Sequence, residues 1–142
     1  MKSVQFILNQ KPDVLYAVSK DSYVYHALEL MMDKNISALL VMDGEALQGI
    51  FTERDYARKV ILQGKASKTT TMEEVMTAKV ITVPPSEPVE NCMAIMTEKH
   101  IRHLPVKENG KIIGFISIGD LVRYVIADQK TTIEHLQSYI SS

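Results

Sequence analysis

The apolar positions of this chain follow one pattern twice. Residues 18–61 align with residues 83–126 without a gap, at a constant spacing of 65 residues. Most positions that are identical in the two stretches are apolar, which indicates one supersecondary unit present in two copies. Each copy is too short to bury its own apolar face, so we expect the two to pack about a pseudo-twofold axis and to share a cleft. The apolar pairs are Val18 and Val83, Val24 and Val89, Met31 and Met96, Ile36 and Ile101, Leu39 and Leu104, and Val41 and Val106.

In the first copy, the spacing of the apolar residues differs from one part to the next. Apolar residues spaced by three and four between Val24 and Met32 indicate an amphipathic helix, whereas the short apolar runs that follow are typical of strands. Gly64 is a suitable residue to end the second helix. The pattern predicts a strand at 14–18, a helix at 23–34, strands at 38–42 and 47–51 joined by a turn at 43–45, and a helix from 53 to about 64.

The second copy predicts the same order of elements. Pro88 fits the first turn of its first helix, because proline lacks an N–H that this position does not need. The predicted elements are a strand at 80–83, a helix at 88–99, strands at 103–107 and 112–116 joined by a turn at 108–110, and a helix at 119–127. The fold class is therefore α+β, with two β-α-β-β-α repeats.

Three segments lie outside the repeated elements. The polar residues 65–71 and a short helix at 72–76 form a linker, and a C-terminal helix at 131–140 carries Ile133, Leu136 and Ile140 on one face. We interpret both termini as packing elements, either onto the repeats or onto a second subunit. The predicted organisation is an N-terminal packing segment at 1–13, repeat 1 at 14–64, the linker at 65–78, repeat 2 at 79–128 and the C-terminal helix at 129–142.

Composition restricts the class of protein. The 142 residues are 46% hydrophobic and 23% charged, as in soluble globular proteins, and the net charge of -1 gives no basic footprint for nucleic acid. No apolar run approaches the roughly 20 residues that span a bilayer, and the N-terminus lacks the features of a secretory signal. We expect a cytoplasmic protein without nucleic-acid or membrane partners. The single cysteine, Cys92, stands where repeat 1 has Ala27, so we interpret it as a small buried hydrophobic residue.

Two repeated polar positions are candidates for chemistry. Thr52 and Asp55 follow an apolar strand in repeat 1, and Ser117 and Asp120 follow the equivalent strand in repeat 2. The structural interpretation is a capping box at a helix start. A carboxylate there can also accept both hydrogens of a ribose 2′,3′-diol, and a helix N-terminus suits a phosphate. Because capping boxes prefer the longer Glu, the Asp favours a ligand role, although a hydroxyl can cap and bind at once.

Basic residues near these positions differ between the repeats. Arg102 and His103 replace Ser37 and Ala38 of repeat 1, so the fold does not require basic groups there, and we predict that one of them contacts a phosphate. Arg54 is a further candidate.

The equivalent of Arg54 in repeat 2 is Gly119, which leaves more room beside Asp120. Unequal occupancy of the two sites is therefore expected. Arg58 and Arg123 are each three residues after an Asp, where an intrahelical ion pair competes with a ligand contact.

The two motifs resemble those of a known family. The stretches ISALLVMDGEALQGIFTERD (36–55) and IRHLPVKENGKIIGFISIGD (101–120) resemble a pair of cystathionine β-synthase (CBS) domains, called a Bateman module, of the stand-alone type. The resemblance covers nearly the whole chain. It implies two pseudo-symmetric repeats packed sheet to sheet, and sensing of an adenosine ligand such as AMP, ADP, ATP, NAD or S-adenosylmethionine.

The resemblance also implies an adenine slot and an assembly. Val18 with Ile116 would line one adenine site, and Val83 with Ile50 the other. All four are also ordinary core residues. Two modules are expected to pair through their helices into a homodimer.

Enzyme and metal functions are disfavoured. The chain lacks both the G-x-G-x-x-G and the G-x-x-x-x-G-K-[ST] phosphate-binding motifs, and His100 and His103 lack the spacing and the accompanying ligands of a zinc site. Two hypotheses remain. The chain is a non-enzymatic adenine-nucleotide sensor that signals to an effector protein, or a nucleotide-independent dimeric adaptor for a protein partner.

Overall fold

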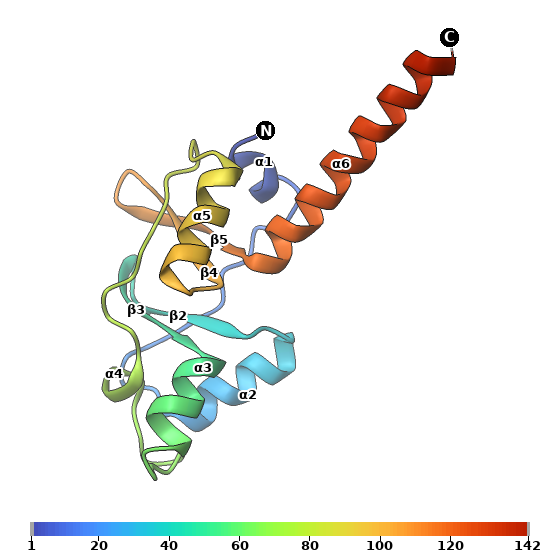
Figure 1. Ribbon diagram of the computed structural model, residues 1–142. Coiled ribbons are helices and arrows are strands. Elements are labelled where there is room, and N and C mark those ends of the chain that lie inside the picture. Colours follow the sequence, from blue (N-terminus) through green and yellow to red (C-terminus); the bar gives the residue numbers. More distant parts are fainter. Residues whose placement is uncertain (1, 142) are drawn as a thin grey trace. The chain divides into compact units, whose positions relative to one another are not determined.

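The fold consists of two small α+β units, as the repeated pattern predicts. The computed structural model describes residues 2–141 (Figure 1). The repeat-1 unit comprises Val14–Ile81 and Asn109–Ile112. The repeat-2 unit comprises the residues up to Asp13, Thr82–Glu108, and the residues from Ile113 onward.

The repeat-1 unit is built around a three-stranded sheet in the order β1-β2-β3. Strand β1 pairs in parallel with β2, and β2 pairs antiparallel with β3. The apolar face of α2 packs on this sheet through Val24, Ala27 and Met31, against Leu39 and Phe51. The elements are β1 (Ala17–Val18), α2 (Val24–Lys34), β2 (Ala38–Asp43), β3 (Ala46–Thr52), α3 (Glu53–Asp55), the π-helical η1 (Tyr56–Ile61) and α4 (Met72–Val75).

The repeat-2 unit has a two-stranded sheet, β4-β5. Its buried core contains Cys92 and Met96 from the apolar face of α5, Leu104 from β4, and Leu121 from the start of α6. The elements are α1 (Val4–Leu8), α5 (Val89–Lys99), β4 (His103–Glu108), β5 (Lys111–Ser117) and α6 (Ile118–Ser141).

The equivalent helices α2 and α5 end in the same way. Asn35 and His100 each follow the last helical residue with a left-handed backbone, at φ 53° and 56°. Asn and His are among the non-glycine residues that adopt this conformation most readily. His100 therefore ends a helix, and the chain can turn directly into β4.

Two predicted elements were wrong. Residues 80–83 form no strand, and only Val83 bridges to Val106. In repeat 1 the N–H of Leu40 donates to the carbonyl of Tyr16 over 3.4 Å, but the equivalent of Leu40 is Pro105, which has no N–H.

The second correction concerns the C-terminus. The helices predicted at 119–127 and 131–140 are one continuous helix, α6. Residues 127–131 contain neither Gly nor Pro, so no residue interrupts the backbone hydrogen bonds.

The segment before each repeat packs in the unit of the other repeat. Helix α4, which precedes repeat 2, lies in the repeat-1 unit, where the N–H of Met72 donates to the carbonyl of Ser22 over 2.8 Å. Helix α1, which precedes repeat 1, lies in the repeat-2 unit, where the N–H of Val4 donates to the carbonyl of Glu87 over 2.9 Å. Ser22 and Glu87 are equivalent, so α1 and α4 are equivalent leading helices, at a spacing of 68 residues rather than 65.

Residues 3–11 and 71–79, which contain α1 and α4 and are called the leading segments below, explain the glycines repeated at positions 49 and 114. A Cβ on Gly49 would lie 2.7 Å from the sulfur of Met76, and a Cβ on Gly114 would lie 2.5 Å from Cδ2 of Leu8. Real Cβ atoms do not come that close to other heavy atoms, so a larger residue would displace the Leu8 side chain at Gly114. At Gly49 it would also meet the backbone carbonyl of Thr77, at 2.9 Å. Within residues 2–141, no helix is both long enough and apolar enough to cross a membrane.

Candidate functional site

The Asp55 carboxylate lies buried at the junction of β3 and α3, with every acceptor position occupied. Oδ2 accepts from the Thr52 N–H over 3.0 Å and from its hydroxyl over 3.2 Å, and the Thr52 hydroxyl accepts from the Asp55 N–H over 3.1 Å. Oδ1 accepts from the Thr77 hydroxyl over 3.1 Å and from Lys59 Nζ over 3.2 Å. A carboxylate has about four lone-pair positions, so these four donors saturate it.

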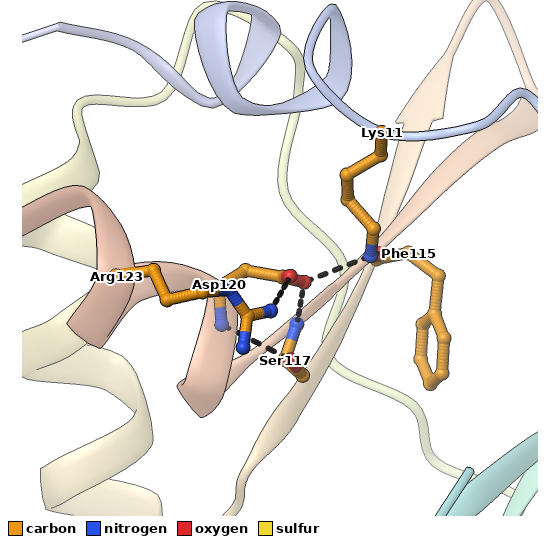
Figure 2. A network of polar contacts seen from close by, with 5 residues as sticks. All are labelled: Lys11, Phe115, Ser117, Asp120 and Arg123. Carbon is orange, nitrogen blue, oxygen red and sulfur yellow. Dashed lines mark hydrogen bonds and ion pairs between the residues drawn. The ribbon is translucent and has the colours of Figure 1, made fainter. Parts of the chain in front are cut away.

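The Asp120 carboxylate has the same place at the junction of β5 and α6. Its Oδ2 accepts from the Ser117 N–H over 2.9 Å, and the Ser117 hydroxyl accepts from the Asp120 N–H over 3.2 Å. Figure 2 shows two cations reaching this carboxylate from different segments. Lys11 Nζ donates to Oδ2 over 2.8 Å and to the Phe115 carbonyl over 2.6 Å, and Arg123 Nη2 donates to Oδ1 over 2.7 Å.

These contacts correct the argument made from side-chain length. Asp closes the capping box at Thr52 as fully as Glu74 closes the box at Thr71, and Ser117 and Asp120 make the same reciprocal bonds. The shorter acid therefore does not argue against a capping role. Capping uses Oδ2 of each carboxylate. Oδ1 pairs with Lys59 at Asp55 and with Arg123 at Asp120, whereas Lys11 shares the capping oxygen of Asp120.

Burial and hydrogen bonding act in opposite directions on Asp120. Burial alone raises the pKa of the carboxyl group, but the hydrogen bonds from Lys11 and Ser117 and the charge of Lys11 outweigh it and lower the pKa. Asp120 is therefore ionised at neutral pH. With Lys11 and Arg123, the cluster carries one negative and two positive charges.

The remaining predicted residues near the two carboxylates are Arg54, Gly119 and Arg58. Arg54 is exposed on α3. The space expected above Gly119 holds the guanidinium of Arg123, whose Nη1 would lie 3.4 Å from an added Cβ. The ion pair expected between Asp55 and Arg58 is made by Lys59 instead, one position further along the helix.

Arg102, just before β4, and His103, its first residue, differ in electrostatic state. His103 stacks on the Phe115 ring at 5.5 Å between centroids. Burial, followed by the nearby charge of Arg102, lowers its pKa to about 4, so the imidazole is neutral at pH 7. Arg102 is exposed and charged. In the absence of a ligand, Arg102 is therefore the positively charged member of the pair at neutral pH.

The predicted adenine residues are divided between the units. Val18 and Ile50 belong to the repeat-1 unit, and Val83 and Ile116 belong to the repeat-2 unit. The side chains of Val83 and Ile116 are buried in the core of their own unit. Both backbone groups of Val83 are bonded to β4, and both of Ile50 are bonded to Thr77. The adenine slot remains a prediction.

Three contacts of the carboxylates were missed by sequence reasoning. Lys11 and Thr77 come from the leading segments, and Lys59 was assigned no role. Between residues 3–11 and 71–79 only Lys11 and Lys79 are identical, so the second spacing is hard to detect. The available signal is the apolar order of Val4, Ile7 and Leu8, which matches Met72, Val75 and Met76.

Comparison with known proteins identifies the family. The model of the CBS domain matches twice, at residues 10–62 and 72–127. The chain belongs to the CBS domain family. The two matches cover most of the chain, and each contains one of the carboxylate junctions.

Individual CBS proteins resemble this chain closely. The CBS domain-containing protein CBSX3, mitochondrial, of Arabidopsis thaliana is 43% identical over 125 residues, and the match covers 84% of this chain but only 61% of that protein. A solved structure of a protein with CBS domains from Burkholderia ambifaria MC40-6 has 56% identity and a TM-score of 0.87, covering 90% of this chain and 96% of that one.

A second solved structure contains ligands. The CBS domain pair of the protein MJ0100 was solved in complex with 5′-methylthioadenosine and S-adenosyl-L-methionine. It has 26% identity to this chain and a TM-score of 0.79, and the match covers 90% of this chain and 98% of that one.

Proposed function

We propose that this CBS pair binds an adenosine ligand, of the AMP, ADP, ATP or NAD type, at the two carboxylate junctions. Each site uses one buried carboxylate, Asp55 or Asp120, to accept the ribose diol. The observation that carries the proposal is that both carboxylates stand at equivalent strand-to-helix junctions and each holds a partly exposed cation. The adenosine ligands of the MJ0100 CBS pair support the same chemistry.

Ligand binding at Asp120 requires one exchange of partners. A diol brings two O–H donors, whereas Ser117, Lys11 and Arg123 leave about one lone-pair position of the carboxylate unused. The side chain of Arg123 is 73% exposed and can leave Oδ1 at little cost. The released guanidinium is then free to bind a phosphate.

Asp55 requires two exchanges. Both donors on Oδ1, from Thr77 and Lys59, would have to leave before a diol could bind there. Lys59 is 41% exposed, but the Thr77 hydroxyl belongs to the segment that packs on Gly49. We therefore infer that Asp120 provides the tighter site.

The charge of the Asp120 cluster selects among adenosine compounds. Because two cations face one carboxylate, a phosphorylated nucleoside is favoured over uncharged adenosine and over the cationic sulfonium of S-adenosylmethionine. Arg102 adds a third cation near the start of the same strand pair. Arg54 adds positive charge beside Asp55.

A regulatory role follows from ligand binding without a reaction. The matched family in both halves of the chain is the CBS domain, and we infer no enzymatic activity. A ligand that binds two arrangements of the repeats unequally shifts the balance between them. The shift is passed on either to a second copy of the chain, through a homodimer surface, or to an effector protein. Several exposed apolar residues at equivalent places in the two repeats support such an interface. They are Ile61 on η1 with Leu62 just after it, and Val122 and Ile126 on α6.

A thermal-shift series tests the proposal. The ligands are AMP, ADP, ATP, NAD, NADH, adenosine, S-adenosylmethionine and GTP, and the proteins are the wild type, Asp55→Ala, Asp120→Ala and the double variant. We expect a concentration-dependent rise in melting temperature with a phosphorylated adenosine ligand, because a ligand that binds only the folded state stabilises it. The rise should be smaller in Asp120→Ala than in Asp55→Ala, and absent in the double variant.

Glu74→Ala provides the matched control. Glu74 closes a third capping box, at Thr71, but it is exposed and belongs to neither site. This variant should melt at a lower temperature and keep the full ligand-induced rise. No rise with any compound, in folded protein shown to be free of bound nucleotide, would favour the nucleotide-independent adaptor. The cytoplasmic location remains a prediction.

A further inference from the structure

Helix α6 carries an exposed apolar stripe from Val122 to Ile140. Val122, Ile126, Ile133, Leu136 and Ile140 are between 47% and 81% exposed, although α6 begins in the core of the repeat-2 unit with Leu121 and Tyr124 buried. In Figure 1 the C-terminal half of α6 extends beyond α1 and α5, the other helices of this unit. A stripe of this length on an ordered helix indicates a binding surface.

The spacing of the stripe is that of a coiled coil. Counting from Val122, the positions follow at intervals of four, three, four, three and four residues, with Gln129 as the one polar member. This is the a/d pattern of a heptad, with Ile126, Ile133 and Ile140 at a and Leu136 at d. A 3.5-residue period matches a partner helix rather than a broad core face.

The choice of residues specifies the partner. Ile at a with Leu136 at d favours two parallel strands, and Val122 and Gln129 occupy the other d positions. The flanking e and g positions bring Val125 opposite Lys130 and Thr132 opposite Gln137 in a parallel pair, so no like charges meet. The stripe is therefore complementary to the same stripe on another copy of the chain.

A membrane surface fits the helix less well. The polar side of the exposed half carries Asp128, Lys130 and Glu134, whereas helices that lie on membranes are rich in Lys and Arg on that side.

We propose that residues 126–140 of α6 form a parallel two-stranded coiled coil with the same segment of a second copy. The segment is about 22 Å long at 1.5 Å per residue, and an isolated helix of that length is marginal in water. Here the folded unit holds the first turns through Leu121 and Tyr124, whose hydroxyl accepts from the Lys2 N–H over 2.8 Å, so helix nucleation is already complete. The coiled coil does not require a bound ligand, and it shares Ile126 with the interface named under the proposed function.

Disulfide trapping in the full chain tests the pairing directly. Cys92→Ala serves as the background, because the equivalent residue of repeat 1 is Ala27. Gln129→Cys lies in the predicted seam at a d position, and Thr131→Cys lies on the outer face at an f position. Under mild oxidation, Gln129→Cys should form disulfide-linked dimers at least about tenfold faster than Thr131→Cys, because pairing raises the effective thiol concentration.

Charge insertion gives a second readout. Ile133→Glu with Leu136→Glu should abolish the trapping of Gln129→Cys, whereas Thr131→Glu with Ser138→Glu adds the same charge to the outer face and should not. Circular dichroism checks that both variants remain folded.

Three results would overturn the proposal. The first is equal cross-linking of Gln129→Cys and Thr131→Cys. The second is preferential cross-linking between Gln129→Cys and Ile133→Cys, because a d position faces an a position in antiparallel helices. The third is binding of the wild type to phosphatidylcholine vesicles that the double Glu variant loses.

Discussion

Replacing Lys11 with Met tests whether the leading segment holds the Asp120 junction. Lys11 is the only residue that joins the N-terminal segment to the carboxylate among the described contacts, and its side chain is 32% exposed against 6% for Asp120. Met keeps most of the apolar stem and removes the ammonium group. Lys11→Met therefore deletes the two hydrogen bonds to Asp120 and the Phe115 carbonyl with little loss of packing.

The cost follows from those two bonds. A hydrogen bond to a charged group contributes about 1.5–3 kcal/mol, and the desolvation of Lys11 and the remaining pair with Arg123 offset part of the loss. We expect Lys11→Met to lower the free energy of unfolding by about 2 kcal/mol at pH 7. For a chain of this size this corresponds to a fall of roughly 4–10 °C in melting temperature.

The pH dependence has a definite sign. The pKa of Asp120 is lowered in the folded state, so its stabilising contribution is present at neutral pH and is lost as the pH falls through the carboxyl range. Once Asp120 is protonated, Lys11 has no charge to pair with. The difference between Lys11→Met and the wild type should therefore shrink on acidification.

Urea denaturation at several pH values measures both effects. Lys111→Met is the matched control, because Lys111 pairs with Glu45 over 3.4 Å where both side chains are exposed, and such pairs contribute at most about 1 kcal/mol. If Lys11→Met unfolds at the same urea concentration as Lys111→Met, or if its deficit does not change with pH, the assignment of Lys11 is wrong.

Three further predictions concern the packing and titration of single residues. Gly114→Ala should lower the free energy of unfolding by about 1–3 kcal/mol, because the added Cβ meets Leu8. The double variant Gly114→Ala with Leu8→Ala should lose less than the sum of the two single losses, and a double-mutant cycle in urea measures the difference. Burial and the charges of Glu87 and Glu90 raise the pKa of Cys92 to about 11, so iodoacetamide at pH 8 should label it only in denatured protein; rapid labelling of folded protein would contradict this. The pKa of His103 is about 4 in the fold against an ordinary 6.5, so stability should fall as the pH drops from 6.5 toward 4, and His103→Gln should lessen that slope. An unchanged slope between pH 6.5 and 5 would contradict it.

Most of the helices and strands can be predicted from the sequence, because the turn residues stand where the spacing of the apolar residues changes. Turn residues such as Gly44 and Gly110 have positive φ angles and separate the strands at the predicted places. The missing strand before Pro84 depended on one absent N–H, at Pro105, in the partner strand. The continuous α6 depended on the absence of any helix-breaking residue near 128, where the repeat itself ends.

The site was only partly predictable. Asp55 and Asp120 are detectable because they recur at one spacing after an apolar strand. Their partners Thr77 and Lys11 come from segments that recur at a different spacing and pack in the unit of the opposite repeat. Such contacts depend on tertiary packing, and the periodicity within one repeat contains no information about them.

Calorimetric titration of the wild type and two single variants tests the central claim most directly. For AMP, about 23 heavy atoms at roughly 0.3 kcal/mol each correspond to a dissociation constant on the order of 10 µM. We expect the wild type to bind AMP more tightly than adenosine, Asp120→Asn to lose the tighter site, and Asp55→Asn to retain it. Equal binding of a phosphorylated adenosine ligand by all three proteins, or binding by none of them, would contradict the account.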